Sequence, residues 1–174
     1  ILLGNIATNL CKQNKKVLLI SLEMSEMLYS KRMSSNIGHV PINEAHLNTE
    51  YLKDTIRKFK DKHGACKLVI KEFPPSTVTP QQLTAYTNKL CQTVMRPDAI
   101  VLDYINLLKG PSSTNSYEQI KKVTEQVRAM SYKFECPIIT ATQLNRSGYN
   151  ETDPGLDTVG ESYGMGATAD CVVS

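Results

Sequence analysis

The sequence predicts an α/β fold in which helices cover both faces of a mostly parallel, twisted β-sheet. The first observation behind this is that short apolar runs alternate with segments of helical periodicity, as in proteins built from strand–helix–strand units. The second is that runs such as Ala99–Leu102 are apolar at every position, which is typical of strands buried on both sides. The third is that 174 residues with 41% hydrophobic content suffice for one domain with a core.

The first half of the chain has the pattern helix, strand, helix, helix, strand. The expected ranges are 1–13, 17–22, 26–37, 50–63 and 66–73. Ser25 is placed to cap the second helix, and Gly38 to end it. Pro74 and Pro75 end the second strand, because proline cannot donate a hydrogen bond to a sheet.

The second half continues the alternation. The expected order is helix from Thr79, strand 98–108, helix 116–134, strand 136–143, a polar loop, a short helix 158–168 and a fifth strand 170–174. Thr79, Pro80 and Gln82 form the sequence signature of a capping box with proline in the first turn, and Ser116 with Gln119 repeats the box.

The composition excludes some classes of protein but does not indicate a particular function. The net charge of +3 is too small to establish a nucleic-acid partner by itself. No apolar run reaches the length that a membrane-spanning helix needs, so no membrane partner is expected. The five cysteines lie far apart and form no C-x-x-C pair. We therefore expect reduced, mostly buried thiols of an intracellular protein, and no zinc site.

Polar side chains stand where three of the expected strands end. These are Glu23, Asp103 and Gln143. Parallel strands with right-handed crossovers bring their carboxyl ends to one edge of a sheet, where ligands of open α/β sheets bind. Two acids and an amide there could hold a magnesium ion, a water and a phosphate. Asp103 would contact the magnesium ion through water, Glu23 would orient an attacking water, and Gln143 would donate to phosphoryl oxygens.

A simpler interpretation of these residues stays open. Acids at strand ends often cap the following helix, and Glu23 precedes a helix whose positive N-terminus it could favour. An apolar run followed by Asp is also a weak pattern when it stands alone.

Three segments in order carry a family resemblance: "VLLISLEMS", "IVLDYINLL" and "ATQLNRS". With the closing "GESYGMGATAD", they resemble the RecA-like motor domain of replicative helicases of the DnaB type, a P-loop NTPase core. The segments "NSYEQIKKVTEQVRAMS" and "SYGMGATAD" look most similar to the helicases of tailed phages. The resemblance implies ATP and Mg²⁺ as cofactors and a homo-hexameric ring on single-stranded DNA. It also implies a primase and a helicase loader as partners, and a cytoplasmic location, in the host cytoplasm if a phage encodes the protein.

The resemblance implies roles for individual residues. Glu23 would polarise the attacking water, Asp103 would bind the magnesium ion, and Gln143 would sense the γ-phosphate. Arg32 matches a family arginine and is expected at the nucleotide, although a solvated surface charge is the alternative. Because Gln143 lies at the root of a loop, a change at the γ-phosphate could shift that loop.

Two loops leave the same sheet edge and are candidates to contact DNA: 109–115 and 145–157. Lys109 and Arg146 could meet phosphates. Backbone groups of a second region could do the same, and its residues are Gly160, Glu161, Ser162, Tyr163 and Gly164. Bacterial relatives usually have Arg-Glu-Ser-Gly there. Because this chain lacks the arginine, we expect DNA contacts in this region to come mainly from backbone groups. Both loops could equally be solvated connections.

By the same resemblance, residues 1–174 are expected to form a single incomplete RecA-like ATPase domain. It would start just after the phosphate-binding loop and end before the arginine finger, and would be inactive by itself. Two other functions stay open: a RecA-type recombinase that forms filaments on DNA, and a non-catalytic ATP-binding module.

Overall fold

The computed structural model describes residues 1–111, 116–142 and 168–173. Its centre is a four-stranded sheet in the order β2-β1-β3-β4, and every neighbouring pair is parallel. The strands are β1 (Lys16–Ser21), β2 (Lys67–Glu72), β3 (Ala99–Asp103) and β4 (Ile138–Thr140). The expected α/β class with a parallel sheet is therefore confirmed.

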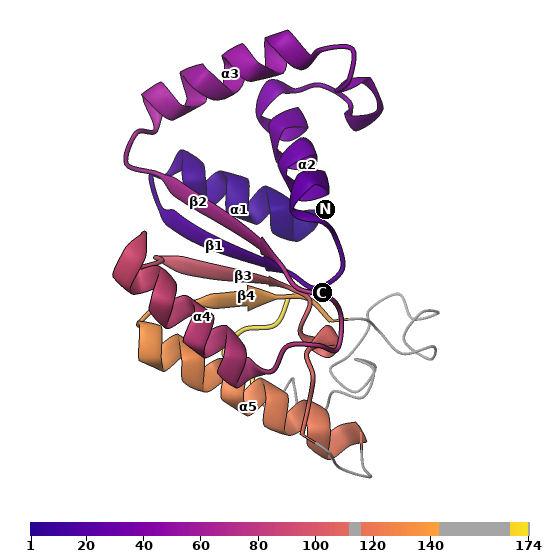
Figure 1. Cartoon of the computed structure of the whole chain (residues 1–174), viewed down its shortest axis with the longest axis vertical. Helices are drawn as coiled ribbons and strands as arrows, with labels where there is room; N and C mark the ends of the chain where they lie inside the picture. Colours follow the sequence, from indigo (N-terminus) through magenta and orange to yellow (C-terminus); the bar gives the residue numbers. More distant parts are fainter. Residues whose placement is uncertain (112–115, 143–167, 174) are drawn as a thin grey trace.

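Helices cover both faces of this sheet (Figure 1). One face carries α1 (Leu2–Lys12) and α2 (Glu26–Gly38), with α3 (Thr49–Lys62) packed on α2. The other face carries α4 (Pro80–Thr93) and α5 (Ser116–Phe134). Short 3-10 turns lie at η1 (Ile42–Glu44) and η2 (Ile105–Leu107).

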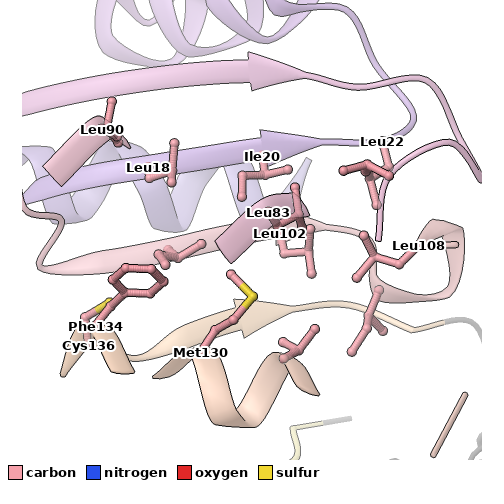
Figure 2. Close-up of a cluster of buried hydrophobic side chains, with 14 of the residues drawn as sticks. Leu18, Ile20, Leu22, Leu83, Leu90, Leu102, Leu108, Met130, Phe134 and Cys136 are labelled. Carbon is pink, nitrogen blue, oxygen red and sulfur yellow. The ribbon is translucent and has the colours of Figure 1, made fainter. Parts of the chain in front are cut away.

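The central strand β1 divides the core into two clusters, because successive side chains of a strand point to opposite faces. Leu18 and Ile20 pack toward α4 and α5, as Figure 2 shows with Met130 and Phe134 of α5. Val17 and Leu19 pack in the other cluster, with residues of α1 and α2. All four are fully buried, as the uninterrupted apolar run predicted.

Local sequence signals set several helix ends. The Ser25 side chain accepts the N–H of Leu28, so Ser25 caps α2 as expected. Both hydrogen bonds of the Thr79–Gln82 capping box are present at the start of α4. Gly38 is the last residue of α2 rather than its stop, and His39 follows it in the left-handed conformation. The Ser116 side chain, which the second expected box needs, is not among those that the structure describes.

Other expected boundaries were wrong. The strand expected over 98–108 ends at Asp103, because the chain turns into η2, where the Leu107 N–H bonds back to the Tyr104 carbonyl. Residues 171–173 are irregular rather than the start of a fifth strand. An apolar run forms a strand only where a neighbouring strand pairs with it, and Val173 is 90% exposed. The helix expected near 158–168 falls on residues that are not described, apart from Thr168.

None of the five cysteines forms a disulfide bond. Burial raises the pKa of Cys11 to about 12 and that of Cys136 to about 11, so both are neutral at physiological pH. Cys171 is exposed. No helix in the described ranges is both long and apolar enough to cross a membrane.

Candidate nucleotide site at the carboxyl edge of the sheet

The carboxyl ends of β1 and β3 meet side by side. Ser21 pairs with Asp103 in the register of the two strands. The Leu22 N–H extends this pairing by donating to the Asp103 carbonyl oxygen at 2.7 Å. Asp103 is thus held at the last position of β3, with its side chain partly exposed at the sheet edge.

A tight turn after β1 places Glu23 at the same edge. The buried Ser21 hydroxyl accepts the N–H of Met24 at 2.9 Å and so closes a turn around residues 22 and 23. Leu22 points into the core, while Glu23 is exposed. The turn leads directly to Ser25 and the start of α2. Glu23 therefore lies between the end of a buried strand and a positive helix terminus.

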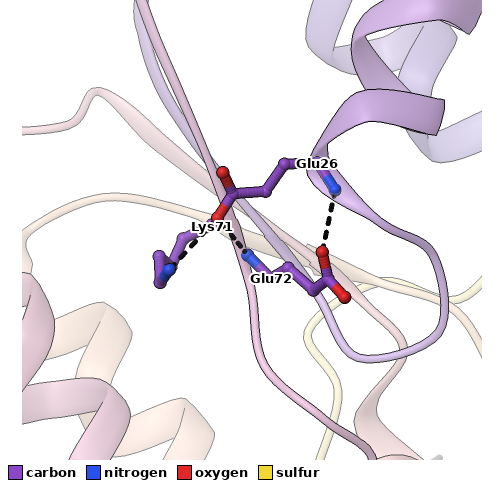
Figure 3. A network of polar contacts seen from close by, with 3 residues as sticks. All are labelled: Glu26, Lys71 and Glu72. Atoms are coloured by element: carbon purple, nitrogen blue, oxygen red, sulfur yellow. Dashed lines mark hydrogen bonds and ion pairs between the residues drawn. The ribbon is translucent and has the colours of Figure 1, made fainter.

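Two glutamates fix the start of α2 to the end of β2 (Figure 3). The Glu26 N–H donates to the Glu72 carboxylate, and the Glu72 N–H donates to the Glu26 carboxylate, each at 3.1 Å. Lys71 Nζ lies 3.1 Å from the same Glu26 oxygen. The Glu72 N–H and the Lys71 ammonium lower the pKa of Glu26. This reciprocal pair anchors the helix that follows Glu23.

Tyr29 is a member of the site that the sequence analysis missed. It is only 1% exposed, and its hydroxyl donates a hydrogen bond to the Asp103 carboxylate. Its ring passes close to α1: a side chain at Gly4 would have its Cβ 3.4 Å from Tyr29 Cε1. The only sequence signal was that Tyr29 and Met33 share the inner face of an expected helix, and this predicts burial rather than contact with an acid.

The pKa of Tyr29 responds to three charged side chains around its hydroxyl. Burial first, and then the hydrogen bond and charge of Asp103, raise the pKa of the Tyr29 phenol far above its usual value. Arg32 lowers this pKa, and Glu23 raises it further. Glu23, Arg32 and Asp103 therefore lie within electrostatic reach of one buried hydroxyl. The structure places Glu23 and Asp103 at one sheet edge, and Arg32 follows Tyr29 by three residues on α2.

The β4 side of the edge is tied to the turn after Asp103 by threonines. Thr140 Oγ1 donates to the Leu102 carbonyl oxygen at 2.8 Å and accepts the Ile105 N–H at 3.2 Å. Thr142 Oγ1 donates to Asn106 Oδ1 at 3.1 Å. Gln143 is the next residue, and it lies outside the described residues. The chain nevertheless reaches Thr142 beside η2, the turn that follows Asp103.

One of the candidate DNA-contacting residues is described. Lys109 is exposed, and its N–H donates to the Val78 carbonyl oxygen at 2.9 Å. The Ser76 N–H likewise donates to the Leu107 carbonyl oxygen at 2.8 Å. These bonds fix the position of Lys109, the first residue of the expected loop 109–115, at the sheet edge. Arg146 and the segment Gly160, Glu161, Ser162, Tyr163 and Gly164 lie outside the described residues.

Comparison with known proteins decides the family. The model of the DnaB-like helicase C-terminal domain matches residues 1–174. The chain belongs to this family. Among curated relatives, the DnaB-like replicative helicase of Enterobacteria phage T4 is 27% identical over 180 residues, which cover 99% of this chain and 38% of the relative. The replicative DNA helicase DnaB of Geobacillus stearothermophilus is 26% identical and covers 97% of this chain.

Solved structures agree on the fold of this DnaB-like domain. A structure described as a DnaB-like replicative helicase and its interactions with primase matches with a TM-score of 0.77 at 20% identity, over 94% of this chain and 41% of that one. A second structure, described as an ATPase domain, matches with a TM-score of 0.78 at 18% identity. The match covers 97% of this chain and 63% of that one. The expected RecA-like α/β fold is confirmed. The chain spans roughly a third to two fifths of the length of the curated relatives, from 32% to 38%.

The donor set of this DnaB-like domain fits a magnesium–nucleotide complex. The Asp103 carboxylate gives one lone pair to Tyr29 and keeps others for a cation or its waters. Within the described ranges, no three His, Cys, Asp or Glu side chains cluster as a metal cage. Mg²⁺ is usually bound by one or two carboxylates, waters and substrate phosphates rather than by such a cage. Arg32, partly exposed on α2, supplies a positive charge nearby.

Proposed function

We propose that this domain is the ATP-hydrolysing motor of a replicative DNA helicase. The observation that carries the proposal is the convergence of Glu23 and Asp103 at one sheet edge, in a chain that belongs to the DnaB-like family. In the whole protein, domains of this kind would form a homo-hexameric ring. ATP hydrolysis at the subunit interfaces would drive translocation on single-stranded DNA and unwinding of the duplex.

The residues at the sheet edge would have different roles in ATP hydrolysis. Glu23, exposed and held by the Ser21 turn, would accept hydrogen bonds from the attacking water and orient it. Asp103 would hold Mg²⁺ through water, and Arg32 would face the nucleotide. Bound Mg²⁺ would neutralise charge on the phosphates during transfer. Gln143 would respond to the γ-phosphate.

Contact with DNA would come from the loops that leave the same edge. Lys109 and Arg146 would meet backbone phosphates, and the segment 160–164 would contribute backbone groups. Binding should depend strongly on salt and little on sequence. A primase and a loader are the expected partners, and the structure of a relative together with primase supports the former. The protein would act in the cytoplasm, or in that of the host if a phage encodes it.

Two substitutions in the intact protein test the proposal. Glu23→Gln should reduce ATP hydrolysis by about a hundredfold or more, as expected for loss of a general base, while binding of a fluorescent ATP analogue persists. Asp103→Asn should reduce hydrolysis and weaken Mg²⁺-dependent nucleotide binding. The matched control is Glu50→Gln, because the Glu50 side chain is 86% exposed in α3 and pairs only with Lys53 among the described residues.

The outcomes separate the possible functions. Wild-type rates in Glu23→Gln would contradict the assignment of the water-orienting group. Strand displacement by the intact protein supports a helicase, whereas strand exchange without displacement indicates a recombinase. Nucleotide binding with no hydrolysis, with or without single-stranded DNA, indicates a non-catalytic module.

A further inference from the structure

Tyr29 connects the metal-binding candidate to a rigid part of the fold. Its backbone N–H donates to the Ser25 carbonyl oxygen at 3.0 Å, the first hydrogen bond of α2. Its side chain belongs to the buried cluster that includes Leu3, Ala7 and Val101. A tyrosine ring has few rotatable bonds and is immobilised when packed on all sides. The hydroxyl at its end therefore occupies a defined position.

We propose that Tyr29 is a positioning residue that holds the Asp103 carboxylate in the orientation required for the magnesium-bound nucleotide. This inference rests on the proposed function and adds to it a residue that no comparison assigns. Tyr29 itself touches neither metal nor nucleotide and acts through Asp103.

The Tyr29 hydroxyl limits the rotation of the Asp103 carboxylate. The side chain of Asp103 stands at the end of β3 and is partly exposed, so rotation about its terminal bond is broad unless a partner restricts it. The Tyr29 hydroxyl donates to Oδ2 and restricts that rotation. A hydroxyl donor does not neutralise the carboxylate, and it leaves the remaining lone pairs for a cation or its waters. Groups that orient metal ligands in this way commonly affect metal affinity strongly.

The same hydrogen bond ties the carboxylate to α2. Glu23 immediately precedes the Ser25 cap region of this helix, and Arg32 lies about one turn beyond Tyr29. The Tyr29 hydroxyl therefore links the metal-holding candidate Asp103 to the segment of chain that carries Glu23 and Arg32. A purely structural role would be to satisfy a buried hydroxyl, and it predicts no effect on metal binding.

The test is the affinity for Mn²⁺, used in place of Mg²⁺, of the intact protein with a non-hydrolysable ATP analogue. Free Mn²⁺ is followed by electron paramagnetic resonance. Tyr29→Phe should weaken Mn²⁺ binding about tenfold, at the lower end of the range for ligand-orienting groups. In ATP hydrolysis, the Mg²⁺ concentration at half-maximal rate should rise similarly, with kcat at saturating Mg²⁺ little changed.

Tyr51→Phe is the matched control. The Tyr51 hydroxyl also donates one hydrogen bond, to the Gly38 carbonyl oxygen at 3.3 Å, but at the opposite end of α2. Its removal should leave Mn²⁺ affinity unchanged. Replacing Tyr29 by 4-aminophenylalanine keeps the ring and restores a donor, and should recover most of the lost affinity even if Tyr29→Phe lowers stability.

Equal Mn²⁺ affinity in wild type and Tyr29→Phe would overturn the inference, as would failure of the 4-aminophenylalanine variant to recover affinity. An unchanged affinity in Asp103→Asn would also overturn it, because Asp103 would then not serve the metal. If the wild-type protein binds Mn²⁺ and nucleotide without hydrolysing ATP, the proposed function fails, but a tenfold effect of Tyr29→Phe on Mn²⁺ still supports the role of Tyr29.

Discussion

Single residues at the sheet edge perform tasks that their chemical type alone does not reveal. The Ser21 hydroxyl shapes the turn that exposes Glu23. The Tyr29 hydroxyl, which belongs to an otherwise apolar cluster, reaches an acid on another strand. Glu26 and Glu72 carry like charges, yet each accepts the other's backbone N–H. In each case the partner is set by which strands and helices lie side by side.

The Glu26 anchor should depend on pH. Because the folded-state pKa of Glu26 is lowered, its stabilising effect is present above the ordinary value of 4.5 and is lost as the pH falls through the lowered value. Glu26→Gln should speed amide hydrogen exchange in the first turn of α2 at about pH 7. Because the Glu26 and Lys71 side chains are partly exposed, the loss of stability should be less than about 1 kcal/mol. Hydrogen exchange of the intact protein, followed by mass spectrometry, measures it.

The difference between Glu26→Gln and wild type should shrink as the pH falls below 4.5, where the carboxylate becomes protonated first in the unfolded and then in the folded state. Glu50→Gln should leave exchange in this turn unchanged at every pH. A difference that persists undiminished in acid would mean that the ionised carboxylate is not the cause.

Among the elements, α4 shows how fully a local signal can define a helix start. The Thr79 hydroxyl accepts the Gln82 N–H, the Gln82 side chain accepts the Thr79 N–H, and Pro80 occupies the first turn. All of these partners lie within four residues in the sequence. The capping box could therefore be predicted without any knowledge of the sheet.

Thr79→Ala should destabilise the first turn of α4 by about 1 kcal/mol, the usual cost of losing an N-cap. Hydrogen exchange of the peptide that covers residues 80–86 measures this loss. Thr93→Ala is the control, because Thr93 stands at the other end of the same helix and bonds only the Lys89 carbonyl oxygen among the described residues. Comparable protection of residues 80–86 in wild type and Thr79→Ala would contradict the expectation.

A hydrogen bond from Thr142 to Asn106 connects the segment after β4 to η2. Thr142 precedes Gln143, and its partner Asn106 lies three residues before Lys109. If Gln143 responds to the γ-phosphate, this bond offers a route to the loop 109–115. Thr142→Val should therefore reduce the stimulation of ATP hydrolysis by single-stranded DNA several-fold, in the range of other network mutations that alter coupling by about 1 kcal/mol, with little change in the DNA-free rate.

The measurement is the ratio of hydrolysis rates with and without saturating single-stranded DNA. Thr93→Val, remote from the sheet edge in α4, should keep the wild-type ratio. Gln143→Ala should lower the ratio more strongly than Thr142→Val. If Gln143→Ala leaves the ratio of the two hydrolysis rates unchanged, Gln143 does not couple DNA binding to ATP hydrolysis.

For the whole molecule, stability rests on a sheet that is buried on both faces. Adjacent residues of β1 serve different clusters: Leu18 packs with α4 and α5, and Leu19 packs with α1 and α2. The candidate site lies at the rim of this sheet rather than within either cluster. The core therefore positions the exposed Glu23 and the partly exposed Asp103 without burying them.

Leu18→Ala and Leu19→Ala should each destabilise the domain by about 2–5 kcal/mol, the usual cost of truncating a fully buried leucine. Urea unfolding of the intact protein, followed by pulse proteolysis and detection of peptides from this chain, measures the loss. Leu47→Ala is the control, because Leu47 is 75% exposed and should cost almost nothing. A similar cost at Leu47 and Leu19 would contradict the two-cluster core.

The sequence alone determined the order of strands and helices from residue 1 to Thr140, the apolar runs of the strands and the capped starts of α2 and α4. These depend on residues close together along the chain, where periodicity and capping chemistry act directly. The placement of Asp103 and Glu23 at one edge also followed, since parallel strands share their carboxyl edge. Only the tertiary structure decided that Tyr29 contacts Asp103, that Glu72 anchors α2 and that Thr142 reaches Asn106. These contacts join residues that are far apart in sequence, and their geometry depends on how helices pack against the sheet, which no local pattern encodes.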